Sequence, residues 1–244
     1  MPNQHHHIET DAHIARIVLD KPRKGNYVDD AMTGELFEAA EAINADNDIY
    51  VVILTGTGKY FCQGGVDKIT RSPAEAIAGI DRPVIAAVNG PAVGPGFELA
   101  LAADIRLCAD TASFSLPQIA EGRLPSGGAT QRLPRIIGRG KALEILLTAA
   151  ALTAEQALEA GLVSAVYPAA ELDKAAVKLA TDIAAKGPLA LRYLKEAVIK
   201  GMDMTLEQGL RLEADLYFLL HTTADRTEGI TAFREKRNPE YRGQ

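Results

Sequence analysis

Residues 82–100 read RPVIAAVNGPAVGPGFELA, and this stretch decides the fold. Its first part, Val84–Val88, is a short and continuous apolar run, which is typical of a strand buried on both faces. A glycine-rich turn over Gly90–Gly96 follows, and the small apolar residues Leu99–Ala103 then indicate a buried helix. The order of buried strand, glycine turn and helix predicts an α/β protein.

The same pattern continues on both sides of this stretch. Apolar runs at Val51–Thr55 and Ile105–Cys108 predict further strands, and Ile8–Asp20 predicts one more. Asp29–Ala45 has apolar residues at helical spacing and predicts an amphipathic helix. The second half is expected to be mostly helical, over Gly140–Ala150, Thr153–Ala160, Glu171–Ala185, Pro188–His221 with an interruption near Gly201, and Arg226–Lys236.

Composition bounds the class of protein. The chain has 244 residues, 47% hydrophobic and 24% charged, which fits one globular domain. The net charge of −6 argues against nucleic acid as a partner, and no apolar run approaches the roughly 18 residues of a membrane span. Two cysteines make no disulfide framework and no signal peptide is visible, so we expect a cytoplasmic protein.

Five segments carry motifs in a fixed order along the chain. They are FCQGGVDK at 61–68, RPVIAAVNG at 82–90, GPGFELA at 94–100 with Ala103-Asp104, PSGGATQRL at 125–133 and EGITAFREKR at 228–237. Together they resemble the signatures of the crotonase (enoyl-CoA hydratase/isomerase) superfamily, from about Ile8 to Gly243.

The resemblance implies a crotonase-like spiral of ββα units over residues 1–187. It implies a C-terminal helical region over residues 188–244 that belongs to the same domain and packs a homotrimer, often stacked into a hexamer. The substrate would be a CoA thioester, with no separate cofactor and no metal. Its carbonyl would bind two backbone N–H groups that form an oxyanion hole, and acidic side chains would move protons at Cα and Cβ of the resulting enolate.

Two residues match the family's catalytic positions directly. Glu98 matches the first catalytic glutamate of the hydratases, and its alternative role is a carboxylate that only stabilises a helix N-terminus. Gly65 matches the first oxyanion donor, and its alternative role is that of a turn glycine.

Other positions depart from the family pattern. Pro95 stands at the second oxyanion donor and has no N–H, so either Gly94 or Gly96 donates instead or the donor is missing. Gln118 stands at the second catalytic glutamate and cannot exchange protons. Glu121 is a possible substitute or a solvated loop glutamate.

Further candidates concern substrate binding. Ser126 replaces a family glycine and is either a hydrogen-bonding group for substrate or a turn serine. The segment after Asp67 is short, so the helix that usually flanks the acyl pocket is expected to shrink to a turn around Ser72–Ala74. His5–His7 are expected to be an exposed tail. The candidate CoA contacts are Arg23, Lys24, Gly64, Asp67, Lys68 and Lys236.

Three functions remain open on the sequence. The leading one is an acyl-CoA enzyme of the hydratase/isomerase type, in which a single base suits a double-bond shift. The second is a carbon–carbon hydrolase of β-diketones within the same superfamily, although no histidine lies between His13 and His221 to serve it. The third is a non-catalytic homologue that binds an acyl-CoA.

Overall fold

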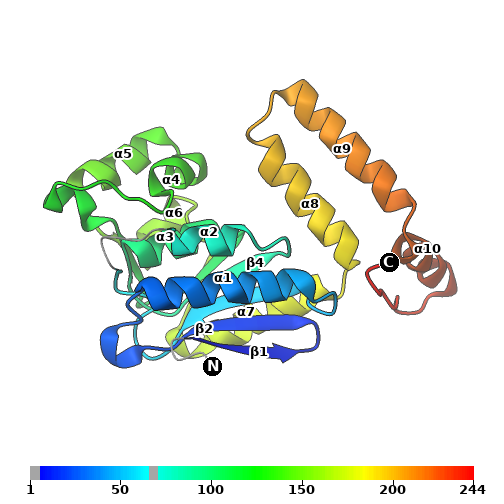
Figure 1. The fold of residues 1–244 in the computed structure, drawn as a ribbon, viewed down its shortest axis with the longest axis horizontal. Coiled ribbons are helices and arrows are strands. Elements are labelled where there is room, and N and C mark those ends of the chain that lie inside the picture. The colour runs from blue at the N-terminus through cyan, green and yellow to red at the C-terminus, as the bar shows by residue number, and fades with distance from the viewer. Residues whose placement is uncertain (1–5, 66–70) are drawn as a thin grey trace.

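The computed structural model describes residues 6–65 and 71–244 and contains a six-stranded sheet flanked by helices (Figure 1). The first strand runs antiparallel to the second, and all other neighbours are parallel. The order across the sheet is β1 (His6–Asp11), β2 (Ile14–Leu19), β3 (Val51–Gly56), β4 (Val84–Val88), β6 (Ile105–Ala109) and β9 (Ala165–Tyr167).

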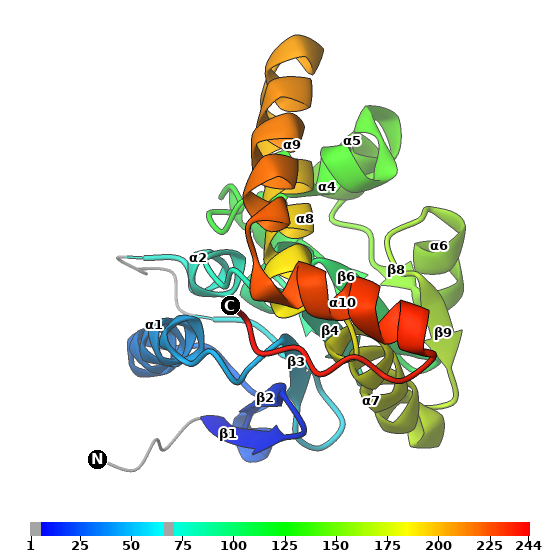
Figure 2. The same ribbon diagram turned by 90° about the vertical axis from the view of Figure 1, so that its right-hand side faces the viewer.

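Helices cover both faces of this sheet, as Figures 1 and 2 show. On one face lie α1 (Asp30–Ala45), α2 (Pro73–Ala78) and α3 (Pro95–Ala102), and on the other lies α7 (Ala169–Ala184). The residues of β3 therefore alternate between two cores. Val52 and Leu54 pack under α1–α3, whereas Val51 and Ile53 pack against α7. This alternation explains why the strand reads as a continuous apolar run.

A second, smaller sheet lies beside the N-terminus of α3. It has the order β5 (Ala92–Val93), β7 (Ser113–Ser115) and β8 (Leu152–Thr153). The elements around it are the 3₁₀ helix η2 (Pro117–Glu121), α4 (Ala129–Ile137), α5 (Arg139–Thr148) and α6 (Ala154–Glu159). Because β5 is followed at once by Gly94 and α3, the small sheet fixes where that helix begins.

The C-terminal helices extend away from the main sheet (Figure 1). They are α8 (Pro188–Gly201), α9 (Leu206–His221) and α10 (Ala224–Glu235), and α8 packs along α9. Large apolar side chains on them stay exposed, among them Leu194, Leu206, Phe218 and Phe233. None of the described helices combines the length and apolar character of a bilayer span.

Most predicted elements are present, but two predictions are wrong. Ile8–Asp20 is a hairpin rather than one strand, because Ala12 and His13 adopt positive φ and reverse the chain. The segment around Ser72–Ala74 is not a turn but the start of α2, whose first turn is capped by the Ser72 hydroxyl.

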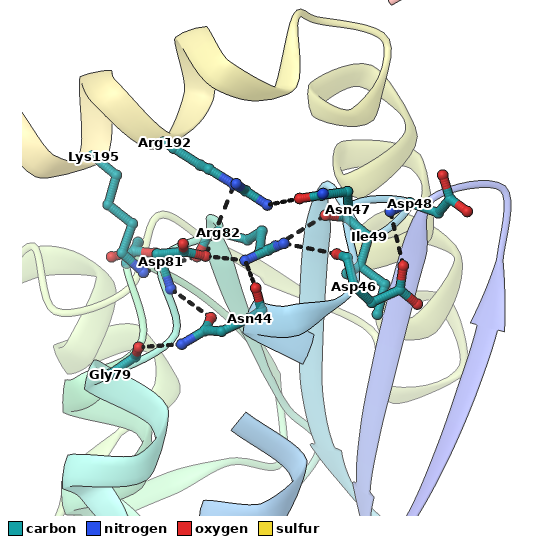
Figure 3. A network of polar contacts seen from close by, with 11 residues as sticks. Asn44, Asp46, Asn47, Asp48, Ile49, Gly79, Asp81, Arg82, Arg192 and Lys195 are labelled. Atoms are coloured by element: carbon teal, nitrogen blue, oxygen red, sulfur yellow. Dashed lines mark hydrogen bonds and ion pairs between the residues drawn. The ribbon is translucent and has the colours of Figure 1, made fainter. Parts of the chain in front are cut away.

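A buried guanidinium ties α1 to the sheet (Figure 3). Arg82 is 1% exposed and donates to the carbonyls of Asn44, Asp46 and Ile49, with N–O distances of 3.1, 2.7 and 3.1 Å. Its own carbonyl accepts from Lys195 of α8 at 2.8 Å. The side chain of Arg82 thus holds the end of α1 and the entry to β3, and its backbone carbonyl binds the first C-terminal helix.

We expect Arg82→Met to lower the free energy of unfolding by at least about 3 kcal/mol, because three carbonyls lose their donor at about 1–3 kcal/mol each. Urea denaturation at fixed protein concentration measures this loss. The control is Arg211→Met, which removes only an exposed ion pair with Glu207 on α9 and should cost less than about 0.5 kcal/mol. Equal effects of the two substitutions would contradict the structural role of Arg82.

Candidate active site

Glu98 is a buried carboxylate in the first turns of α3. It is 2% exposed, and its Oε1 accepts from the N–H of Gly127 at 2.6 Å and of Ala129 at 3.2 Å. These donors lie at the start of α4. The motif at 125–133 therefore binds the glutamate that the motif at 94–100 supplies. Within the described part of the chain no group donates to Oε2, which leaves this oxygen for a substrate proton.

Gly127 must be a glycine for this carboxylate to fit. A Cβ at position 127 would lie 2.8 Å from both Cδ and Oε2 of Glu98 and 2.8 Å from Oγ of Ser72. The same geometry places the N-terminal cap of α2 beside the carboxylate. The short segment before α2 therefore still reaches the site, through Ser72.

Burial sets the acidity of Glu98. Desolvation raises the pKa of its carboxyl above the ordinary glutamate value, and the donors Ala129 and Gly127 and the cation of Arg132 oppose that rise. Arg132 donates to the carbonyl of Gly127 at 2.7 Å, so it also braces the loop that holds the carboxylate. A glutamate with a raised pKa is suited to exchange protons near neutral pH.

Gly65 and Pro95 lie next to each other, as the resemblance implies. A Cβ on Gly65 would be 3.0 Å from Cγ of Pro95, so the glycine permits this close approach. Pro95 is the first residue of α3 and presents its ring where another residue would present an N–H. The preceding N–H, of Gly94, is already bound to the carbonyl of Ser115 at 2.8 Å.

Gly96 fixes the loop that carries Gly65. A Cβ at position 96 would lie 2.3 Å from the carbonyl oxygen of Cys62, so only glycine lets α3 pack this closely on residues 61–65. Cys62 is fully buried and donates its thiol to the Gly64 carbonyl at 3.3 Å. Burial raises the pKa of the Cys62 thiol to about 12, which makes it a packing group rather than a nucleophile.

Gln118 reaches the same place from η2. It is 6% exposed, and its Oε1 is buried with no hydrogen-bond partner. A Cβ on Gly94 would be 3.2 Å from its Nε2. In contrast, Glu121 at the end of η2 is exposed and forms an ion pair with the neighbouring Arg123. Ser126 is also exposed, directly before Gly127.

The candidate CoA contacts lie in different parts of the structure. Arg23 and Lys24 are exposed on the 3₁₀ helix η1 (Pro22–Lys24), and with Asp20 and Lys21 they line a surface hollow. Gly25, directly after η1, accepts from the N–H of Gln63 at 2.8 Å, which joins these cations to the Gly64–Gly65 loop.

The other candidate positions lie elsewhere. Lys236 caps the end of α10, and no contact joins it to this group in the described ranges. Asp67 and Lys68 fall outside the described residues, as does His5. The expected exposed tail is wrong for His6, which is 1% exposed in β1 with Nδ1 3.2 Å from Oε2 of Glu35. Residues 6–65 and 71–244 hold no cluster of three metal-ligating side chains.

The sequence reading missed the groups that hold Glu98. Ala129 and Arg132 belong to a motif that we noted only for its resemblance, and α4 itself was not predicted because Pro134 interrupts its pattern. The signal was present in the two adjacent glycines Gly127 and Gly128, since a glycine pair before a helix favours a close approach of backbone to another group.

Comparison with known proteins identifies the family. The sequence profile of the enoyl-CoA hydratase/isomerase family matches residues 9–244. The chain is 35% identical to the 2,3-dehydroadipyl-CoA hydratase of Escherichia coli, covering 95% of this chain and 96% of that protein. It is 38% identical to the (E)-benzylidenesuccinyl-CoA hydratase of Thauera aromatica, over 97% and 98% of the two chains.

A solved structure gives the same answer for the fold. The crystal structure of an enoyl-CoA hydratase from Bacillus anthracis superposes with a TM-score of 0.95 at 38% identity, over 99% of this chain and 100% of that one. The crotonase fold expected from the motifs is thereby confirmed. With the family profile matching almost the whole length, this chain belongs to the enoyl-CoA hydratase/isomerase family and is an enzyme of that type.

Proposed function

We propose that the enzyme moves a double bond along the acyl chain of an enoyl-CoA thioester, with Glu98 as its proton carrier. The observation that carries this proposal is that Glu98 is the single buried carboxylate of the site among residues 6–65 and 71–244. Two carboxylates are buried among the described residues, and the other, Asp225, binds the N–H groups of Arg242 and Gly243 near the C-terminus. A single carboxylate can take a proton from one carbon and return it to another.

The reaction would begin with a 3-enoyl thioester. Oε2 of Glu98 takes a proton from Cα, and the electron pair moves into the thioester carbonyl to form a dienolate. The same carboxyl then delivers that proton to Cγ, the carbonyl re-forms and the product is a 2-enoyl thioester. Because the intermediate carries its charge on the thioester oxygen, each aligned N–H donor lowers the barrier by about 2.7–4 kcal/mol.

Hydration of a 2-enoyl thioester is the second candidate, favoured by the hydratase names of the two relatives. It would require Glu98 alone to activate water and protonate Cα, because Gln118 cannot accept a proton. The β-diketone hydrolase is less favoured. His13 stacks on Tyr50 and His221 contacts Tyr217, and neither contacts Glu98.

The proposal includes the partners of the site. The CoA thioester is itself the substrate, and this proton transfer uses only side chains and N–H groups of the protein. Arg23 and Lys24 are the proposed contacts for the phosphates of CoA, since they are exposed cations joined to the Gly65 loop. We place the enzyme in the cytoplasm, where acyl-CoA thioesters are made and consumed.

We also propose a homotrimer, or a hexamer of stacked trimers, packed through residues 188–244. The support is the set of large apolar side chains that α8–α10 leave exposed, including Phe233 at 85% and Leu206 at 80%. Patches of this kind on a single chain are typical of subunit interfaces.

We expect Glu98→Gln to lower kcat on 3-enoyl-CoA by about 10²–10⁴-fold, because the amide retains the shape of the side chain but cannot carry the proton. Turnover of short 2-enoyl- and 3-enoyl-CoA thioesters measures this. The matched control is Glu121→Gln, which neutralises the exposed carboxylate paired with Arg123 and should keep native activity. Native activity in Glu98→Gln, or collapse in Glu121→Gln, would overturn the assignment.

The pH profile should report the environment of Glu98. As a base it works when ionised, so kcat/KM falls as pH drops through its pKa, which burial raises. Removing a cation that opposes this rise should raise the pKa further, so Arg132→Met is expected to move the acidic limb to higher pH. Arg135→Met, which removes a more exposed cation from the same helix, should leave the limb in place. A limb that stays put or moves to lower pH in Arg132→Met would contradict this reading.

A further inference from the structure

The position expected for the second oxyanion donor, Pro95, carries no N–H. The N–H of Gly94 is bound to the carbonyl of Ser115 at 2.8 Å. Gly65, which matches the first donor, lies against the Pro95 ring, since a Cβ on it would be 3.0 Å from Cγ of Pro95. An enolate held by one donor instead of two would form about 10²–10³-fold more slowly.

The side-chain amide of Gln118 is next to this gap. Its Nε2 lies 3.2 Å from the position a Cβ on Gly94 would occupy, and Gly94 immediately precedes Pro95. Gln118 is only 6% exposed. Its Oε1 is buried, and no described residue forms a hydrogen bond with either end of the amide. A buried polar group without a hydrogen-bond partner costs about 1–3 kcal/mol. Such groups are rare in native proteins, and each calls for an explanation.

We propose that the carboxamide of Gln118 is the second oxyanion donor and replaces the N–H that Pro95 removes. This inference rests on the proposed enolate chemistry of the same site. Because no described residue accepts from Nε2, its N–H groups can donate to the thioester oxygen without breaking another hydrogen bond. A side-chain amide is a sufficient donor, as the oxyanion holes of unrelated enzymes show.

The charge of the residue matters for this role. A glutamate at position 118 would place a carboxylate against the developing negative charge of the thioester oxygen, and like charges at this distance repel. Gln118→Glu is therefore expected to be slower than the neutral Gln118→Met. If position 118 instead served water activation, Gln118→Glu would raise the rate of hydration, and that gain would overturn the proposal.

The decisive experiment restores the backbone donor. Gln118→Met, which keeps the length of the side chain without its N–H, should lower kcat/KM for 3-enoyl-CoA by about 10²–10³-fold. Combining it with Pro95→Ala returns an N–H to the first position of α3, which is unbonded within a helix, and should recover most of that loss. Native activity in Gln118→Met, or a double variant no faster than the single one, would overturn the proposal.

A spectroscopic measurement separates this role from a structural one and does not need turnover. Butyryl-CoA cannot isomerise, so the infrared carbonyl band of its bound thioester reports the donors directly. We expect the band to shift to lower frequency on binding, and the shift to shrink in Gln118→Met but not in Glu98→Gln. An unchanged shift in Gln118→Met would refute the proposal, whereas a wild type that binds butyryl-CoA but turns over no enoyl-CoA would refute only the proposed function.

Discussion

A carboxylate inside a protein is costly unless donors replace its water, and Glu98 meets this condition through the N–H groups of Gly127 and Ala129. This contact joins the first turn of α3 to the start of α4, 29 to 31 residues further along the chain. It also explains why residue 127 is a glycine, because a Cβ at this position would collide with the carboxylate.

Two residues that we interpret as departures from the family's motifs lie close together in space. Pro95 carries no backbone donor, and Gln118 places an amide where the motif has a carboxylate, with its Oε1 buried and without a partner among the described residues. Considered one at a time, each looks like lost function. Because the amide of Gln118 lies beside Gly94, directly before Pro95, the two residues fit the proposed site with two donors and a single proton carrier.

The sequence predicted the parts of the fold that follow from local pattern. The runs at Val51–Thr55 and Val84–Val88 are strands because both of their faces are buried, and the motif around Glu98 marked the buried carboxylate correctly. The hairpin at Ala12–His13 was missed because no glycine marks its positive φ. The burial of His6 and the hydrogen bond from the Ala129 N–H to Glu98 depend on contacts between segments that are distant in the sequence. The spacing of residues along the chain does not reveal such contacts.

The central claim is that one carboxyl group carries the proton from Cα to Cγ. It is tested most directly by single turnover of 3-enoyl-CoA deuterated at Cα, with the product read by NMR. We expect part of the deuterium to reappear at Cγ of the 2-enoyl product, because the buried carboxyl of Glu98 retains it between the two steps. A product that keeps its second deuterium at Cα but carries none at Cγ, with the abstracted deuteron lost entirely to water, would contradict a single-carboxylate transfer.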